Sequence, residues 1–261
     1  MRMLAVATVV LVGCSHAPAG GGGGGDDEPV PDAGGEQPAA WSADPACSAA
    51  ADAIYGATPS GGRGAVLSCA LGERLELAAV QAAMAGEGAE GVTAQTGVRV
   101  VKLAYRTVRS DGSAAVTTAT AYLPRAPRAL PAPIVLVGRS TSGLADACAP
   151  SKERMPGKNL ALPFAARGFV TITPDFSGLG NAGTHAYLDT HEEVAQLFDG
   201  ALALRALLAP GTGGDPVAAV GYSQGGGVVL GAQALEHAMT GRRTLKAVAA
   251  IAPEWPISTS T

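Results

Sequence analysis

The sequence predicts an α/β fold in which a mostly parallel sheet carries helices on both faces. Two observations lead to this prediction. From about residue 130 onward, short continuous apolar runs alternate with helical patterns, an arrangement that is typical of parallel sheets. The chain also has 261 residues, of which 47% are hydrophobic and 15% charged, so it can bury a substantial core.

The first half of the chain predicts fewer regular elements. We expect residues 46–96 to form an N-terminal helical segment, with a helix over Leu75–Ala85. Apolar and polar residues then alternate over Val98–Val108 and again over Ala115–Leu123, as they do in strands with one buried face. The run Ser110-Asp111-Gly112 between them predicts a hairpin turn.

The second half repeats strand and helix. Continuous apolar runs predict buried strands, and longer amphipathic or alanine-rich runs predict the helices between them. The predicted strands are Ile134–Val137, Phe169–Thr173, Val217–Val220 and Leu245–Ile251, and the predicted helices are Leu160–Ala166, Thr190–Leu208 and Gln224–Met239. Thr190 and Glu193 match a capping box at the start of the second of these helices.

Composition argues against several classes of function. The net charge of -4 provides no basic excess for phosphate backbones, and 4% aromatic residues offer no stacking platform for single strands. The cysteines and histidines show no spacing typical of a zinc site. We therefore expect no nucleic-acid partner, no metal and no organic cofactor, and the sequence does not indicate an oligomeric state.

The N-terminus reads as an export signal. Leu4–Val12 is apolar but too short to span a bilayer, and the run LVGC that ends at Cys14 resembles the lipobox of bacterial lipoproteins. That resemblance implies a signal peptide over residues 1–13, acylation of Cys14 and a membrane anchor. Residues 14–45, rich in Gly and Pro, are expected to form a flexible tether. We expect an exported cell-envelope lipoprotein anchored in the outer membrane; the alternative is an ordinary signal peptide with an incidental cysteine.

The other cysteines fit an oxidising compartment. Cys47 and Cys69 are close in sequence and flank a stretch with helical character, so we expect a disulfide between them. Cys148 is then either free or paired outside this chain.

The most informative motif is Gly221-Tyr222-Ser223-Gln224-Gly225, which matches G-x-S-x-G. With 36 glycines in the chain, the pattern alone is weak, and a glycine-rich turn without a role is the alternative reading. Its position gives it meaning, because Ser223 falls between a buried strand and a helix that opens at Gln224. A nucleophilic serine on a strained strand-to-helix turn needs this placement. Ser223 is therefore the predicted nucleophile.

Such a serine needs donors for the oxyanion that forms when it attacks a carbonyl. The backbone amide of Gln224, directly after the nucleophile, is one expected donor. The second should come from the loop that follows the strand Ile134–Val137, which reads GRSTSG over residues 138–143.

Three segments in order, STSGLADACAPS (140–151), RGFVTITPDFSGLG (167–180) and GYSQGG (221–226), resemble the secretory lipase family of α/β-hydrolases. The resemblance runs from about Val98 to Trp255. It implies an α/β-hydrolase core over residues 97–261 and places Thr141 at the family's threonine, which makes its amide the second oxyanion donor. Arg139 and Ser140 stand where the family usually has His-Gly.

The family's catalytic acid and histidine follow the serine in the order Ser…Asp…His. On this resemblance we expect neither of them within the chain, and we expect the last strands of the sheet to be missing as well. The interpretation is a C-terminally truncated chain with little or no turnover.

Other titratable residues fit the missing roles poorly. His237 lies about 20 Å down the helix from Ser223, too far to act as its base. His185 and Tyr222 are candidate pocket residues. Glu254 follows the last predicted strand, where a capping or solvent role is the simpler reading, and Asp175 is expected to order its own loop.

The sequence thus predicts a serine carboxylic-ester hydrolase that acts on an ester or lipid through an acyl-enzyme. Two alternatives stay open. One is a non-catalytic, lipid-anchored binding protein on the same fold. The other is a different enzyme built on the same turn: a cutinase-like esterase, a peptidase or an acyltransferase.

Overall fold

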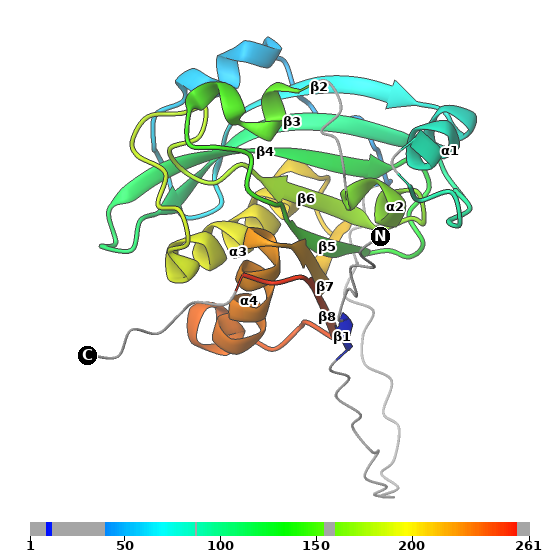
Figure 1. Cartoon of the computed structure of the whole chain (residues 1–261). Coiled ribbons are helices and arrows are strands. Elements are labelled where there is room, and N and C mark those ends of the chain that lie inside the picture. The colour runs from blue at the N-terminus through cyan, green and yellow to red at the C-terminus, as the bar shows by residue number, and fades with distance from the viewer. Residues whose placement is uncertain (1–8, 12–39, 87, 154–159, 255–261) are drawn as a thin grey trace, which may run out of the picture.

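The computed structural model describes residues 9–11, 40–86, 88–153 and 160–254. Within these ranges the chain forms one mixed sheet in the order β1-β8-β7-β5-β6-β4-β3-β2 (Figure 1). The strands are β1 (Val9–Leu11), β2 (Val66–Leu75), β3 (Val98–Val108), β4 (Ala114–Pro124), β5 (Ala132–Gly138), β6 (Val170–Pro174), β7 (Gly213–Tyr222) and β8 (Ala247–Ile251).

Helices cover both faces of this sheet (Figure 1). They are the 3₁₀ helices η1 (Ala51–Gly56), η2 (Asp146–Cys148) and η3 (Pro150–Lys152), and the α-helices α1 (Leu77–Gly86), α2 (Ala161–Ala165), α3 (Thr190–Leu207) and α4 (Gln224–Thr240). The long helices α3 and α4 pack over one apolar core, while α1 and α2 pack over a second core on the opposite face. Strands that are buried on both faces read as continuous apolar runs, which is why β5 and β6 were recognisable in the sequence.

Strand direction divides the sheet into two parts. β6, β5, β7 and β8 run parallel to one another, whereas β2, β3 and β4 are antiparallel and β4 joins the parallel part by an antiparallel pairing with β6. The carboxyl ends of the parallel strands therefore meet at one edge, where α/β proteins place their sites. The predicted α/β fold class is confirmed.

Sequence reasoning missed the strand β2. It lies in the segment expected to be helical, yet it pairs with β3 over its length and extends the sheet. Two register shifts interrupt this pairing, between Val66 and Ser68 and between Leu71 and Arg74. Bulges of this kind break the alternation of apolar and polar residues by which a strand is recognised.

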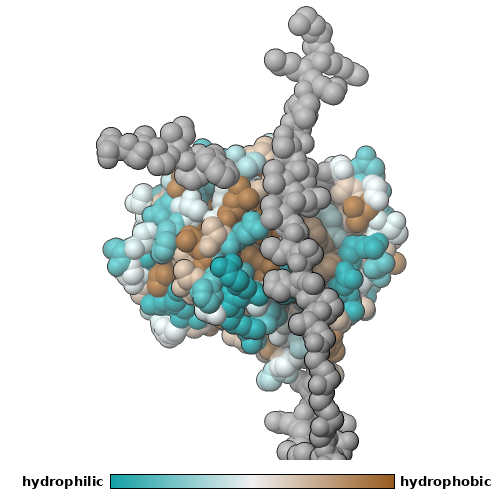
Figure 2. Space-filling model, turned by 90° about the horizontal axis from the view of Figure 1, so that it is seen from below, coloured by the Kyte–Doolittle hydropathy of each residue, from teal (hydrophilic) through white to brown (hydrophobic). Residues whose placement is uncertain are grey.

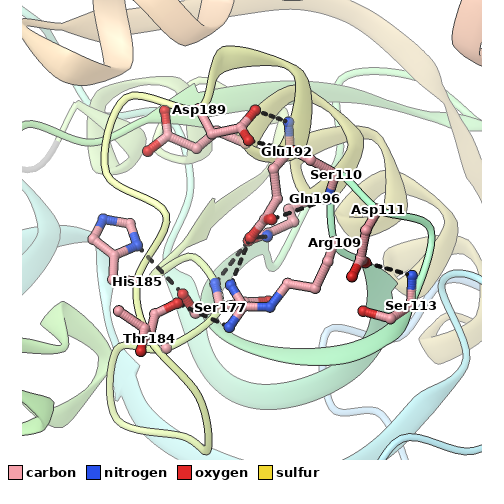
Figure 3. Close-up of polar contacts among 12 residues, drawn as sticks. Arg109, Ser110, Asp111, Ser113, Ser177, Thr184, His185, Asp189, Glu192 and Gln196 are labelled. Atoms are coloured by element: carbon pink, nitrogen blue, oxygen red, sulfur yellow. Dashed lines mark hydrogen bonds and ion pairs between the residues drawn. The ribbon is translucent and has the colours of Figure 1, made fainter.

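The expected capping box at Thr190 and Glu193 is wrong. Asp189 is the N-cap of α3, and its carboxylate accepts a hydrogen bond from the Glu192 amide at 3.0 Å (Figure 3). An Asp accepts from an N-terminal amide of a helix as well as a threonine does. Glu193 is buried instead and contributes to the site described below.

Cys47 and Cys69 form a disulfide, and the Cys148 thiol is free and half-buried. The expected anchor residue Cys14 and most of the expected tether lie outside the described residues. Val9–Leu11, in the expected signal peptide, pair with β8 as the edge strand β1. Among the described residues no helix is long and apolar enough to cross a bilayer. On the face drawn in Figure 2, hydrophobic residues form small patches between hydrophilic ones.

Candidate active site

Ser223 occupies the turn between β7 and α4. Its backbone has φ 54° and ψ -118°, in the region that residues with a side chain rarely adopt. Such a conformation costs roughly 1–3 kcal/mol and persists only where the surrounding structure holds it. This is the strained strand-to-helix turn that the G-x-S-x-G motif predicts.

Glycines permit this turn because two backbones approach closely there. A Cβ on Gly225, in the first turn of α4, would lie 2.0 Å from the carbonyl oxygen of Gly138 at the end of β5. A Cβ on Gly221 would lie 2.1 Å from the carbonyl oxygen of Gly225. Since both obstacles are backbone atoms, any side chain at these positions would force strand and helix apart.

Backbone hydrogen bonds from β8 and its following loop hold the turn in place. The Ser223 N–H donates to the carbonyl of Ile251 at 3.0 Å. The Ser223 carbonyl accepts from Gly227 at 3.1 Å and from Glu254 at 3.0 Å. The strained residue is thus fixed by three backbone contacts, two of them to the adjacent strand end and loop.

Gln224 is the first residue of α4, so its N–H has no carbonyl partner within the helix and lies at the positive end of the helix dipole. The loop that carries Thr141 begins at the end of β5, close to this same turn of the helix. The Arg139 carbonyl oxygen, at the start of that loop, would lie 2.6 Å from a Cβ on Gly225. Thr141 is exposed, and its hydroxyl lies 3.1 Å from the Tyr187 hydroxyl. Both expected oxyanion donors therefore lie at the carboxyl edge of the sheet.

Arg139 organises the loop after β5 and was not anticipated as a functional residue. Its buried guanidinium donates to the carbonyl of Asp175 at 2.9 Å, to the carbonyl of Ser140 at 2.7 Å and to the Ser142 hydroxyl at 2.8 Å. It also lies 5.6 Å from the centre of the Phe176 ring. Burial lowers the pKa of Arg139 from its ordinary value. One side chain thereby joins the loops after β5 and β6.

Asp175 is the buried partner of this arrangement. Its carboxylate accepts from the Thr118 hydroxyl at 2.7 Å, from the Ser151 amide at 2.9 Å and from the Ser151 hydroxyl. Burial raises the pKa of Asp175 above its ordinary value, while these hydrogen bonds and the nearby Arg139 oppose the rise. Its contacts order the loop, as the sequence analysis expects.

A second chain of buried polar groups begins at the side chain of Gln224, the residue after Ser223. The Gln224 side-chain amide donates to the Glu193 carboxyl at 2.5 Å and lies 3.4 Å from His185 Nε2. His185 Nδ1 lies 3.3 Å from the carbonyl of Ser177. A neutral ring with its proton on Nδ1 would satisfy both contacts, because a carbonyl can only accept and an amide N–H can only donate. Burial lowers the pKa of His185 and raises that of Glu193 to about 8.

The loop that carries His185 is fixed from the hairpin between β3 and β4 (Figure 3). Arg109 donates to the Glu192 carboxylate at 2.7 Å and to the Thr184 carbonyl at 2.8 Å. Gln196 donates to the same carboxylate at 3.0 Å and accepts from the Ser177 amide at 2.8 Å. The turn that the sequence predicts at 110–112 therefore supports the site from outside it.

A base and an acid for Ser223 are not found in the described part of the chain. No hydrogen bond there joins the Ser223 hydroxyl to a histidine or a carboxylate, and His237 lies in the last turn of α4. The Glu254 carboxylate accepts from the Tyr187 hydroxyl at 3.3 Å instead. The described residues also contain no cluster of ligands that could hold a metal ion.

A cavity of about 330 Å³ lies beside the serine turn. Tyr222, which precedes the serine, lines it, as do Gly138 and Ser140 from the loop after β5 and Ile251 from the end of β8. Tyr222 thus lines this cavity, whereas His185 is not among the residues described as lining it.

Replacing Gly225 with alanine should prevent normal packing of α4 on β5. We expect a loss of at least about 3 kcal/mol in the free energy of unfolding, because the added Cβ meets backbone that cannot move aside. Urea unfolding followed by circular dichroism measures this loss. Gly86→Ala is the matched control, since nothing lies within 4 Å of a Cβ at that helical position. Equal stability of the two variants would contradict the close approach.

Glu193 should make stability depend on pH. Its pKa in the folded protein, about 8, is above the ordinary value of 4.5, so the folded state binds the proton more tightly. The contribution of protonated Glu193 to the free energy of unfolding is fully present below about pH 4.5. It is lost as pH rises toward 8, at about 1.4 kcal/mol per pH unit. Glu193→Gln should remove this part of the slope between pH 5 and pH 8, measured by urea unfolding. Glu90→Gln, at an exposed position, should leave the slope unchanged. A Glu193→Gln variant whose free energy of unfolding changes with pH as steeply as that of the parent would refute the assignment.

Comparison with solved structures of known proteins supports the fold. Neither the protein-family models nor the curated proteins contain a match. Among solved structures, a ligand-bound form of the rice cell wall degrading esterase LipA from Xanthomonas oryzae is 25% identical, with a TM-score of 0.58 over 71% of this chain and 48% of that one. Candida antarctica lipase A in its closed state is 19% identical, with a TM-score of 0.53 over 75% of this chain and 43% of that one.

The chain thus spans about half the length of the solved structures that it matches. The chain has the α/β-hydrolase fold, and the solved structures that it resembles are lipases and esterases.

Proposed function

We propose that the chain is a serine carboxylic-ester hydrolase that acts on an ester or lipid through an acyl-enzyme. The observation that carries this proposal is the strained backbone of Ser223, which stands at the carboxyl edge of the sheet directly before the free N–H of Gln224. Strain of this kind at a strand-to-helix turn is typical of a nucleophile on this fold.

The chemistry follows from the arrangement. The Ser223 oxygen would bond to the acyl carbon, the carbonyl oxygen would take up negative charge, and the amides of Gln224 and Thr141 would stabilise that charge. The bond from the acyl carbon to the ester's alcohol oxygen then breaks, and the alcohol leaves with the proton that the serine hydroxyl gave up. Water later releases the acyl group and returns a proton to the serine. Since the described residues place no base beside the Ser223 hydroxyl, we expect its reaction to be slow compared with that of a complete triad.

A second candidate function is a non-catalytic binding protein on the same fold. The observation that favours it is the same lack of a histidine or carboxylate hydrogen-bonded to Ser223 in the described residues. The two functions differ in whether Ser223 forms a covalent bond with an electrophile.

A fluorophosphonate probe tests the choice. Incubation of the purified chain with excess probe should give one adduct, mapped by peptide mass spectrometry to Ser223, that accumulates slowly and is absent from Ser223→Ala. Ser60→Ala, at an exposed serine outside the site, should label at the parental rate. No adduct on Ser223 after prolonged incubation would favour the binding protein.

We also propose that the protein is exported and anchored in the outer membrane by lipid on Cys14, with residues 14–45 as the tether. The apolar run before the LVGC segment supports this proposal. Cys14→Ser should abolish incorporation of labelled palmitate in a Gram-negative host and move the protein from the membrane fraction to the soluble fraction. Palmitate labelling that survives the substitution would refute lipidation at Cys14.

A further inference from the structure

Glu193 carries a buried carboxyl group that the proposed reaction does not use. It lies in the first turn of α3, and the residue is only 2% exposed. Its Oε1 accepts a hydrogen bond at 2.5 Å from the side-chain amide of Gln224, which opens α4. The contact therefore joins the start of one long helix to the start of the other, at the residue that follows Ser223.

Gln224 has two separate parts in the site. Its backbone N–H is the proposed oxyanion donor, while its buried side chain is held from α3 and from the loop after β6. The contact with Glu193 is the shorter of the two, since the amide nitrogen lies 3.4 Å from His185 Nε2. A buried amide that loses its acceptor is unfavourable, so the position of Gln224 depends on an acceptor at residue 193.

The same contact brings a carboxyl group close to the place where negative charge would form. Only the length of one glutamine side chain separates the Glu193 oxygen from the Gln224 N–H, so the two lie within about 9 Å of each other. A carboxylate at that distance would repel an oxyanion bound to this N–H, and burial reduces the screening by water and salt. Oxyanion stabilisation therefore requires a neutral carboxyl group at this position.

The surroundings of Glu193 favour its neutral form at neutral pH. Burial raises the pKa of Glu193 to about 8, although the charge of Arg139, from the loop after β5, opposes the rise. Asp189, at the N-cap of α3, adds to the rise. The neighbouring Glu192 carboxylate forms an ion pair with the hairpin between β3 and β4 at 2.7 Å (Figure 3). Burial lowers the pKa of His185, which therefore adds no positive charge at neutral pH.

We propose that Glu193 is a positioning residue for oxyanion stabilisation. Its neutral carboxyl group holds the Gln224 side chain at the start of α4 and leaves no negative charge close to the Gln224 N–H. This role rests on the proposed ester hydrolysis, because the oxyanion forms only when Ser223 attacks. Ionisation of Glu193 would slow that attack, since the new charge opposes the charge that develops on the substrate oxygen.

The rate of labelling by a fluorophosphonate tests this role, because the phosphonyl oxygen takes up negative charge as Ser223 attacks phosphorus and fluoride leaves. In Glu193→Gln, an acceptor oxygen for the Gln224 amide is kept, but residue 193 can no longer ionise. The ratio of the parent's rate constant to that of Glu193→Gln should fall about tenfold between pH 6.5 and pH 9.5. Taking the ratio at each pH removes the increase in serine reactivity that both proteins share.

Glu236→Gln is the matched control. Glu236 is another buried glutamate, 3% exposed, which accepts hydrogen bonds from the backbone of Thr244 and Leu245. It lies roughly 18 Å along α4 from Gln224, so its charge should have little effect at the serine. The corresponding ratio for this variant should stay constant with pH. Circular dichroism at each pH checks that every protein is folded, which separates a slower reaction from unfolding.

Glu193→Ala tests the positioning separately from the charge. Alanine offers no acceptor to the Gln224 amide, so at pH 6.5 this variant should be labelled about fivefold more slowly than Glu193→Gln, the effect of one net hydrogen bond. The comparison between the two variants excludes the charge, since neither side chain ionises. If Glu193→Ala does not fold, the pH dependence of the Glu193→Gln ratio still decides the proposal.

The outcomes separate this role from the proposed function. Labelling at Ser223 with a rate ratio that does not change with pH would overturn the role of Glu193 and keep ester hydrolysis. The absence of any label at Ser223 would remove the proposed function and this role with it. A folded Glu193→Ala variant that is labelled as fast as Glu193→Gln would refute the positioning of Gln224.

Discussion

The close approach of the end of β5 to the first turn of α4 is the constraint on which the site depends. The Gly138 carbonyl occupies space that a side chain on Gly225 would need, so the helix begins directly against the sheet edge. The chain must therefore turn sharply within one residue, and that residue is Ser223. The same turn leaves the Gln224 N–H at the start of the helix, beside the serine. The position of the proposed nucleophile, the proposed oxyanion donor and the backbone strain thus have a single steric origin.

Buried polar side chains hold the loops around this turn. Arg139 and Asp175 join the loops after β5 and β6 to η3, and Glu193 joins α3 to the Gln224 side chain. Removing each of these groups from water is unfavourable, which is why the pKa values of Asp175 and Glu193 rise and that of Arg139 falls. Hydrogen bonds offset the unfavourable free energy of removing these groups from water, and they also hold the loops in one arrangement. The site is therefore built on a rigid scaffold of α3, α4 and the parallel strands.

The parts of the structure that sequence could predict are those set by local pattern. The buried strands, the long helices and the turn at 110–112 follow from periodicity and turn chemistry, and the motif around Ser223 follows from its place between β7 and α4. β2 escaped prediction because bulges interrupt its alternation. The inward direction of Glu193 also could not be predicted, because burial depends on how α3 packs against α4, which no local pattern records.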